Sequence, residues 1–330
     1  MKVETVDENL KKTLDVFRNN DSFLLAGHEH PDGDCIGSEI ALALLLKKWD
    51  KDVHIFNPDP PEPIYYFLPY IQWVKTTLPE EPVDVAVILD SGDLNRTGAV
   101  QEYIKSVETM INVDHHPESF NVGDINLVDP EMSSVGEIVY NMYHETGETI
   151  SKEAAQVLYI SLMTDTGSFR YANTQASSHE AAAELIRNGY IEPYRIYSML
   201  YERETFESTQ LFGEVLSNIQ EENGIVWAEV PRTLFEGRDV EPQDLKGVLQ
   251  YMRRIDICKV AVLFQERSED EVKVNFRAKS DFNLLSVVNQ FDGGGHEKAA
   301  GATIQGSLDT IREEFLSAVK EALPASTAAR

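Results

Sequence analysis

A polar loop that could bind a metal ion follows an apolar segment near the start of the chain. Residues 24–38 read LLAGHEHPDGDCIGS, so a short apolar run leads to His28, with Asp32 and Asp34 following before a helical pattern begins. An imidazole and two carboxylates at the carboxyl end of a strand are typical of a metal site. The glycine between the aspartates permits a tight loop that aims both side chains at one region. Taken alone, this loop would more often be a polar turn with an N-capping aspartate.

Two further clusters stand where apolar segments end, and they favour the metal-site interpretation. Asp90 ends the run VAVILD, and an uncompensated carboxylate at the end of a buried strand is costly. At the edge of the same sheet, such a carboxylate could bridge two cations. The run INVDHHP contains Asp114, His115 and His116, whose adjacent imidazoles must point in different directions from an extended backbone. One imidazole could therefore bind metal while the other faces a substrate, and Asp114 could orient a ring.

A fourth segment, SLMTDTGSFRY, offers Asp165 and, further along, Arg170. By itself it carries little weight, because TDTG is also a good helix end, but it completes a set of histidines and aspartates. Such a set could hold two divalent ions about 3.5 to 4 Å apart, which activate water for phosphoryl displacement. Mixed imidazole and carboxylate ligands suit Mn²⁺ better than Mg²⁺, and Co²⁺ or Zn²⁺ could substitute. The predicted metal ligands are His28, Asp32, Asp34, Asp90, Asp165 and one of His115 and His116.

Two segments of the second half could bind an anion. The run FRAKS places Arg277 and Lys279 on one face of a predicted strand, which favours a surface that binds a phosphate or a base. The run GGGHEKAAG could expose backbone N–H groups that cradle an anion. A glycine-rich tract alone would more simply be a flexible loop. The predicted substrate-binding residues are Arg170, Arg277, Lys279, Gly293, Gly294, Gly295 and His296.

The order of the apolar and helical patterns predicts an α/β fold in two domains. In the first half, apolar runs alternate with helical patterns, which is typical of a mostly parallel sheet with helices on its faces. The second half predicts a smaller α+β domain, connected by one long helix over 195–219. The predicted domains are 1–192 for metal binding and catalysis, 193–221 for a helical linker and 222–330 for substrate binding.

The individual elements follow from the same patterns. The predicted strands are 23–27, 53–56, 83–90, 110–114, 225–230, 256–265 and 271–278. The predicted helices are 36–49, 134–144, 151–163, 177–189, 195–219, 283–291 and 308–323. Ser134, Ser151 and Ser177 are the expected starts of three of these helices.

Composition narrows the classes of partner. A net charge of -27 argues against a basic footprint for long duplex nucleic acid, so a nucleic-acid partner should be a short single-stranded oligonucleotide or a small phosphorylated nucleotide. Cys35 and Cys258 are too few for a disulfide framework, which fits a reducing cytosol. The first ten residues are polar, and no run reaches the ~18 apolar residues of a membrane span, so we expect a cytoplasmic protein without a membrane partner. The sequence leaves open whether the protein forms a homodimer.

In their order along nearly the whole chain, these motifs resemble the DHH family of phosphoesterases, in the branch whose second domain carries GGGH. The resemblance is greatest to stand-alone enzymes that act on very short RNA and on 3'-phosphoadenosine 5'-phosphate. It implies that His28, Asp32 and Asp90 hold one metal ion. It also implies that Asp34, Asp90, His115 and Asp165 hold the second, with Asp90 bridging. His116 would face the scissile phosphate, oriented by Asp114, and Arg277, Lys279 and His296 would hold the nucleotide.

Other functions share these motifs. Cyclic and linear dinucleotide phosphodiesterases of the family carry the same ligand set. A manganese-dependent pyrophosphatase would also share the first-half ligands, but GGGH argues against it, and a processive exonuclease would need a basic channel. From another class, a catalytically silent nucleotide sensor would not need a complete metal-ligand set.

Overall fold

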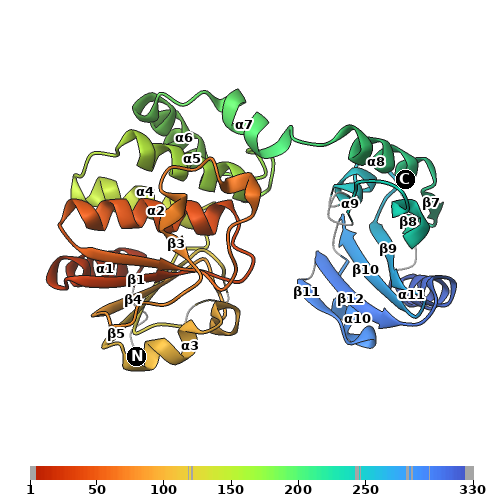
Figure 1. Ribbon diagram of the computed structural model, residues 1–330, viewed down its shortest axis with the longest axis horizontal. Helices are drawn as coiled ribbons and strands as arrows, with labels where there is room; N and C mark the ends of the chain where they lie inside the picture. The colour runs from red at the N-terminus through yellow and green to blue at the C-terminus, as the bar shows by residue number, and fades with distance from the viewer. Residues whose placement is uncertain are drawn as a thin grey trace. The chain divides into compact units, whose positions relative to one another are not determined.

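The computed structural model describes residues 5–117, 119, 122–241, 245, 247–279, 282–283, 285–296 and 298–323, without the side chains of Gly295 and His296. The chain forms two compact units, which divide between Glu202 and Arg203. Each unit has its own sheet (Figure 1), and hydrophobic clusters pack against it. No helix in the described ranges is long and apolar enough to cross a membrane.

Unit 1 is built on a parallel sheet of six strands in the order β3-β2-β1-β4-β5-β6. The central strands β1 and β4 are almost entirely buried, as expected of apolar strands that are covered on both faces. Because the strand pairs are parallel, their carboxyl ends lie along one edge of the sheet. The strands are β1 Ser22–Ala26, β2 Asp52–Phe56, β3 Val74–Lys75, β4 Val85–Leu89, β5 Thr109–Asp114 and β6 Ile125–Val128.

Helices α2, α4 and α5 stack over one side of this sheet, and α6 packs on α5 (Figure 1). Helix α2 is buried over nearly its whole length, because it lies between the sheet and α5. The α-helices are α1 Val6–Asn19, α2 Gly33–Lys48, α3 Val100–Tyr103, α4 Val135–Thr146, α5 Lys152–Asp165, α6 Ala176–Gly189 and α7 Pro193–Tyr201. The 3-10 helices are η1 Pro63–Tyr65, η2 Ile71–Trp73, η3 Leu94–Thr97 and η4 Ile104–Ser106.

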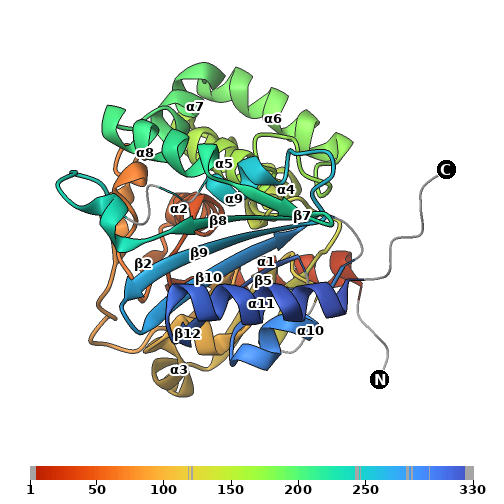
Figure 2. The same ribbon diagram turned by 90° about the vertical axis from the view of Figure 1, so that its right-hand side faces the viewer.

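Unit 2 contains a mixed sheet of six strands in the order β11-β12-β10-β9-β8-β7, in which β8 and β9 are parallel. Trp227 and Val262 face a core under α11, which lies across the strands in Figure 2, while Ala228 and Leu263 face a second core that includes α8. The strands are β7 Gln220–Glu222, β8 Ile225–Val230, β9 Val260–Ser268, β10 Glu271–Ala278, β11 Gly294–His296 and β12 Ala299–Gln305. The helices are α8 Phe206–Ser217, η5 Arg232–Phe235, α9 Val248–Met252, α10 Leu285–Val288, η7 Asn289–Phe291 and α11 Leu308–Ala322.

The prediction of a single long helix over 195–219 is wrong, because two helices form there. Helix α7 ends at Tyr201, and the hydroxyl of Thr205 accepts a hydrogen bond from the N–H of Ser208 to start α8. Leu200 of α7 packs into the core of unit 1, whereas Leu211 of α8 packs into unit 2. The connecting segment is therefore divided into two helices, because Thr205 starts a second helix and because the two helices pack into different cores.

The other predicted strands and helices are confirmed with bounds that move by a few residues, except that the helix predicted over 283–291 is the short α10 followed by the 3-10 helix η7. One helix start differs: α6 begins at Ala176 and not at Ser177, because Gln175 is its N-cap and the hydroxyl of Ser178 accepts the Gln175 N–H. The sequence did not indicate the short strands β3 and β7 at the sheet edges, nor β11 and β12.

Candidate two-metal centre

Neighbouring strands of unit 1 deliver polar side chains to one edge of the sheet. His28 follows β1, Asp90 follows β4 and Asp114 ends β5. Asp165 joins them from the end of α5. The structure therefore brings together all the residues predicted as metal ligands, which are His28, Asp32, Asp34, Asp90, His115 and Asp165.

Three overlapping groups of donor atoms are close enough to hold an ion. Two of them together contain the six predicted ligands, and Asp90 faces both; the third consists of Asp90, Asp114, His115 and His116. Within each group the donor atoms lie within 4.8 Å of one another; the first group is His28, Asp32 and Asp90, and the second is Asp34, His115 and Asp165. Oδ2 of Asp90 lies 3.6 Å from Nε2 of His28, while its Oδ1 lies 3.8 Å from Nε2 of His115. A carboxylate can bridge two ions by presenting one oxygen to each of them.

Asp90 also has an uncommon backbone conformation. Its φ is 55°, in the left-handed region that costs a residue other than glycine on the order of 1 kcal/mol. The neighbouring strand stabilises this turn, since the N–H of Asp90 donates to the carbonyl of Val113 at 3.2 Å. Strain of this kind is typical of functional sites.

Burial and crowding make this centre unfavourable for ionised carboxylates without cations. Burial, followed by the charges of Asp34 and Asp32, raises the pKa of Asp90 well above its usual value. Burial and the same two neighbours raise the pKa of Asp165 to about 8. Divalent cations would remove this penalty by stabilising the ionised forms. Because oxygen and imidazole donors suit Mn²⁺, Co²⁺ or Zn²⁺, the residues fit the predicted ions.

Without metal, the protein should become less stable as pH rises towards 8. The pKa of Asp165 is raised from 3.8 to about 8, so its contribution is fully present below the lower value and is lost as pH rises through the upper one. Urea unfolding in EDTA at several pH values in this range would measure how steeply the free energy of unfolding falls with pH. The Asp165→Asn variant is the comparison. We expect a flatter profile for Asp165→Asn, and an unchanged slope would refute the effect.

The loop after β1 is fixed by its own aspartate. Oδ1 of Asp32 accepts hydrogen bonds from the N–H groups of Asp34 and Cys35 at 2.9 and 3.1 Å, and so caps α2. The N-capping role considered for this loop is therefore present. It coexists with the place of Asp32 in the first donor group.

Asp34 is anchored at the N-terminus of α4, a contact that the sequence did not indicate. Its buried carboxylate accepts hydrogen bonds from the N–H groups of Val135 at 2.8 Å and Gly136 at 3.0 Å, and from Ser161 Oγ at 2.5 Å. The start of a helix favours negative charge. Burial nevertheless raises the pKa of Asp34, so a cation would stabilise its ionised form further.

Gly136→Ala should destabilise unit 1, because its methyl carbon would lie 1.8 Å from Ser161 Oγ. Overpacking of this kind lowers the free energy of unfolding by about 1 to 3 kcal/mol. Gly213→Ala is the matched control, since a methyl group at that position in α8 meets nothing within 4 Å. Alanine there should raise stability by roughly 0.5 to 1 kcal/mol. Thermal unfolding compares the two variants, and shifts of the same sign would refute the packing argument.

The two adjacent histidines have different surroundings, as the extended backbone predicts. Nε2 of His115 lies 3.6 Å from Asp165 Oδ2, and its Nδ1 lies 3.3 Å from the carbonyl oxygen of Met132. Nδ1 of His116 lies 2.8 Å from Asp114 Oδ1, and 42% of its side chain is exposed. His115 thus belongs to the carboxylate cluster, while His116 is accessible at its margin.

The His116 and Asp114 side chains form a charged pair. The hydrogen bond to Asp114 raises the pKa of His116, although burial opposes this shift. Burial would raise the pKa of Asp114, but hydrogen bonds from His116 and Ser119 outweigh it and lower the pKa. The pair therefore favours an imidazolium at His116 beside an ionised carboxylate at Asp114. The imidazolium is a suitable proton donor.

The pKa of His28 is shifted in the opposite direction to that of His116. Burial lowers its pKa, which favours the neutral ring that a metal ligand requires. Its Nδ1 donates to the carbonyl of Glu29 at 2.6 Å, so Nε2 is left to face Asp90. Hydrogen bonding of one ring nitrogen to the backbone thus fixes the nitrogen available to metal.

Sequence reasoning missed two polar residues that contact the centre. Nη2 of Arg96 lies 3.2 Å from Nδ1 of His28, and the Arg96 carbonyl accepts the Glu29 N–H at 2.7 Å. Asn173 donates to Asp165 Oδ2 at 3.2 Å and also to the Asp165 carbonyl at 3.1 Å. Arg96 lies in the polar segment that follows Asp90. Its position in that segment is the only feature of the sequence that could have indicated its role.

The predicted substrate-binding cations occupy three different environments. Nε of Arg170 donates to the carbonyl of Gly167 at 2.6 Å, in the turn after Asp165. In unit 2, Arg277 lies on the less buried face of β10. Lys279 follows β10, and its ammonium donates to the carbonyls of Ile255 and Asp256 at 3.1 and 3.3 Å, so it already stabilises a loop. Their roles towards substrate stay predictions.

The glycine-rich segment is not the loop that the sequence suggested. Gly294–His296 form the edge strand β11, which pairs antiparallel with residues 299–301 of β12. Gly293 packs closely, since a methyl group there would lie 2.4 Å from Val288 Cγ2. The small residues of both strands allow this close pairing. The predicted roles of Gly295 and His296 depend on side-chain surroundings that lie outside the described part.

Comparison with known proteins agrees with this arrangement. Residues 22–162 match the model described as "DHH family, N-terminal domain", and residues 223–324 match "DHHA1 domain". The chain is 31% identical over 307 residues to "Bifunctional oligoribonuclease and PAP phosphatase NrnA" of Thermus thermophilus, covering 91% of this chain and 89% of that protein. A protein of the same name from Bacillus subtilis is 27% identical over 288 residues, covering 86% and 90%.

A solved structure extends the likeness to three dimensions. The crystal structure of an exopolyphosphatase-related protein from Bacteroides fragilis superimposes with a TM-score of 0.88 at 25% identity, covering 97% of this chain and 98% of that chain. The first family match contains His28, Asp90 and the Asp-His-His run, and the second contains the glycine-rich strand. The chain therefore belongs to the DHH family and is a metal-dependent phosphoesterase.

Proposed function

We propose that this enzyme hydrolyses short oligonucleotides and 3'-phosphoadenosine 5'-phosphate, releasing nucleoside monophosphates, with Mn²⁺ in both donor groups. The observation that carries the proposal is the Asp90 carboxylate, whose two oxygens face His28 and His115 separately. The names of the relatives from Thermus thermophilus and Bacillus subtilis support this choice of substrates.

The chain's own residues would divide the chemistry between them. When bound, the two ions would activate water and neutralise charge on the phosphate. His116 would give a proton to the leaving oxygen from Nε2, because Nδ1 is engaged by Asp114. His115 and Asp34 would keep their places through contacts with the Met132 carbonyl and the start of α4. Arg277, Lys279 and His296 would bind the nucleotide.

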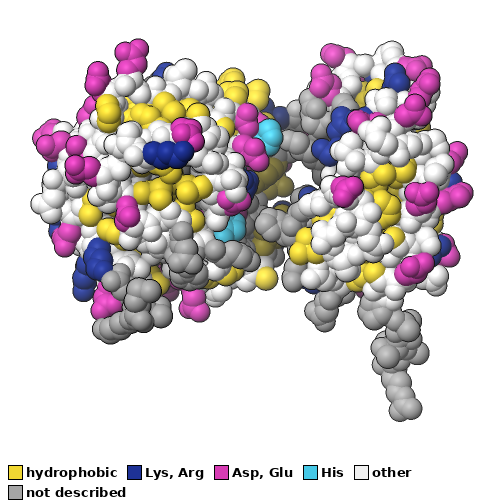
Figure 3. Space-filling model, turned by 90° about the horizontal axis from the view of Figure 1, so that it is seen from below, with side chains coloured by type: hydrophobic (Ala, Val, Ile, Leu, Met, Phe, Trp, Pro, Cys, Tyr) yellow, Lys and Arg dark blue, Asp and Glu magenta, His cyan; other side chains and the backbone are white. Residues whose placement is uncertain are grey.

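The charge of the surface favours a small substrate. Acidic side chains are scattered over the visible faces of both units in Figure 3, and the net charge is -27. A long duplex would need many basic contacts to its phosphates. A short oligonucleotide needs only local cations, which the metal centre would supply.

A substrate panel tests the proposal. Turnover with Mn²⁺, with and without EDTA, would be measured on 5'-labelled RNA dimers to pentamers, 3'-phosphoadenosine 5'-phosphate, linear and cyclic di-adenylate, and pyrophosphate. We expect cleavage of the short RNAs and the bisphosphate, lost in EDTA and restored by Mn²⁺. Preferential cleavage of a cyclic or linear dinucleotide would favour the phosphodiesterase alternative. Binding without turnover in any metal would contradict the proposal.

A further inference from the structure

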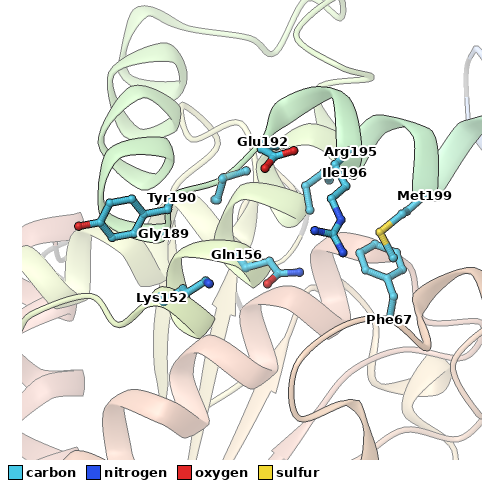
Figure 4. Close-up of a pocket in the computed structure, with 10 residues that line it drawn as sticks. Phe67, Lys152, Gln156, Gly189, Tyr190, Glu192, Arg195, Ile196 and Met199 are labelled. Atoms are coloured by element: carbon cyan, nitrogen blue, oxygen red, sulfur yellow. The ribbon is translucent and has the colours of Figure 1, made fainter.

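A separate cavity lies in unit 1 among α5, the end of α6, α7 and the segment after η1 (Figure 4). Its volume is about 340 Å³, within the range of about 300 to 1,000 Å³ of small-molecule sites. None of its lining residues belongs to the two donor groups. The cavity is therefore distinct from the metal centre, and the proposed catalytic function does not use it.

Two basic side chains line this cavity from different helices. Lys152 of α5 and Arg195 of α7 have the amide of Gln156 between them in Figure 4. Within the described ranges, neither cation has an ion pair or a side-chain hydrogen bond. Both side chains are exposed at the mouth of the cavity, as many basic residues of unit 1 are, so their charges are accessible to an anionic ligand.

The charge balance of the lining remains positive. Glu192 is the acidic residue on the lining, so it offsets one of the two basic charges of Lys152 and Arg195. A guanidinium and an ammonium together suit a phosphate group, because both donate charge-assisted hydrogen bonds to its oxygens. Gln156 adds a neutral donor.

The rest of the lining suits a planar ring. Phe67, Ile196 and Met199 supply apolar surface beside the cations. Tyr190 is 84% exposed and lies at the opposite end of the lining, with its ring pointing away from these three residues in Figure 4, so it is not part of this apolar wall.

We propose that this cavity is a second binding site for a small organic phosphate that carries a planar ring. The phosphate lies between Lys152 and Arg195, and the ring lies against Phe67, Ile196 and Met199. A nucleoside monophosphate is the simplest compound with both features, so AMP is the probe.

Calorimetric titration of AMP tests this site without the metal centre. The full-length Asp90→Ala/Arg277→Ala protein in EDTA serves as the background, so that metal-dependent binding and the nucleotide contact proposed for Arg277 in unit 2 are both removed. We expect one equivalent of AMP per chain whose affinity falls by about tenfold or more in Lys152→Glu/Arg195→Glu, because charge-assisted hydrogen bonds are lost. The control Lys11→Glu/Arg187→Glu makes the same change of charge at exposed positions of unit 1 and should bind AMP within about twofold of the background.

A second variant separates ring binding from folding. Met199→Gln should fold like the background, because Met199 is only partly buried and glutamine has a side chain of similar length. It should weaken the binding of AMP while leaving the binding of inorganic phosphate unchanged. Equal AMP affinity in both charge-changing double variants, or no AMP binding at millimolar concentration, would overturn the proposal.

Discussion

Asp90→Asn should reduce kcat by about 10³-fold or more, as expected when a central electrostatic group of an active site is removed. Asparagine keeps the shape of the side chain but removes the charge that both donor groups share. Oδ2 and Oδ1 of Asp90 lie 3.6 and 3.8 Å from the Nε2 atoms of His28 and His115, so neither group should retain its full metal affinity. Turnover of a labelled RNA dimer at several Mn²⁺ concentrations measures the loss.

Asp93→Asn is the matched control for this prediction. Asp93 stands in the same segment, but it is exposed and caps η3 through the N–H of Asn95. We expect kcat within about twofold of the wild type, since an exposed cap affects stability by only about 1 kcal/mol. Similar losses in both variants would indicate a general effect on folding.

His116→Gln should lower kcat by about 10²- to 10⁴-fold, the usual contribution of a general acid, while Mn²⁺ binding stays close to that of the wild type. The imidazole is accessible at the margin of the centre, and its Nδ1 lies 2.8 Å from Asp114. The control is His144→Gln, an exposed histidine of α4 that lies 3.3 Å from Glu184. Loss of metal together with activity in His116→Gln would assign this residue to metal binding.

The pH profile tests the same role independently. A proton donor acts in its protonated form, so activity should fall as pH rises through the pKa of His116. The hydrogen bond to Asp114 raises that pKa. Asp114→Asn weakens this interaction and should move the alkaline fall of kcat to lower pH. An alkaline limb that does not move would show that another group controls it.

The sequence could predict those parts of the fold that depend on local patterns. Strand β4 is a continuous apolar run because both faces are covered, and Asp90 was visible as the charge that ends it. The contacts of Asp34 were not visible, because Gly136 and Ser161 lie far from it in the chain and meet it only after folding. Such tertiary contacts have no local sequence pattern.

Two corrections have a similar origin. A glycine-rich tract alone would more simply have been a loop, yet Gly294–His296 pair with residues 299–301 as a strand. The connecting helix was interrupted because Thr205 offered an N-cap and because Leu200 and Leu211 belong to different cores. In both segments, contacts between residues distant in the sequence determined the secondary structure more than local propensity did.

The central claim is that Asp90 joins two metal ions in one centre. Its most direct test is to count the manganese bound at saturation in the wild type and in Asp90→Asn, with electron paramagnetic resonance to detect coupling between ions. We predict two Mn²⁺ per wild-type chain, magnetically coupled at about 3.5 to 4 Å, and loss of the coupled pair in Asp90→Asn. A single uncoupled ion in the wild type, or an intact coupled pair in Asp90→Asn, would contradict the account.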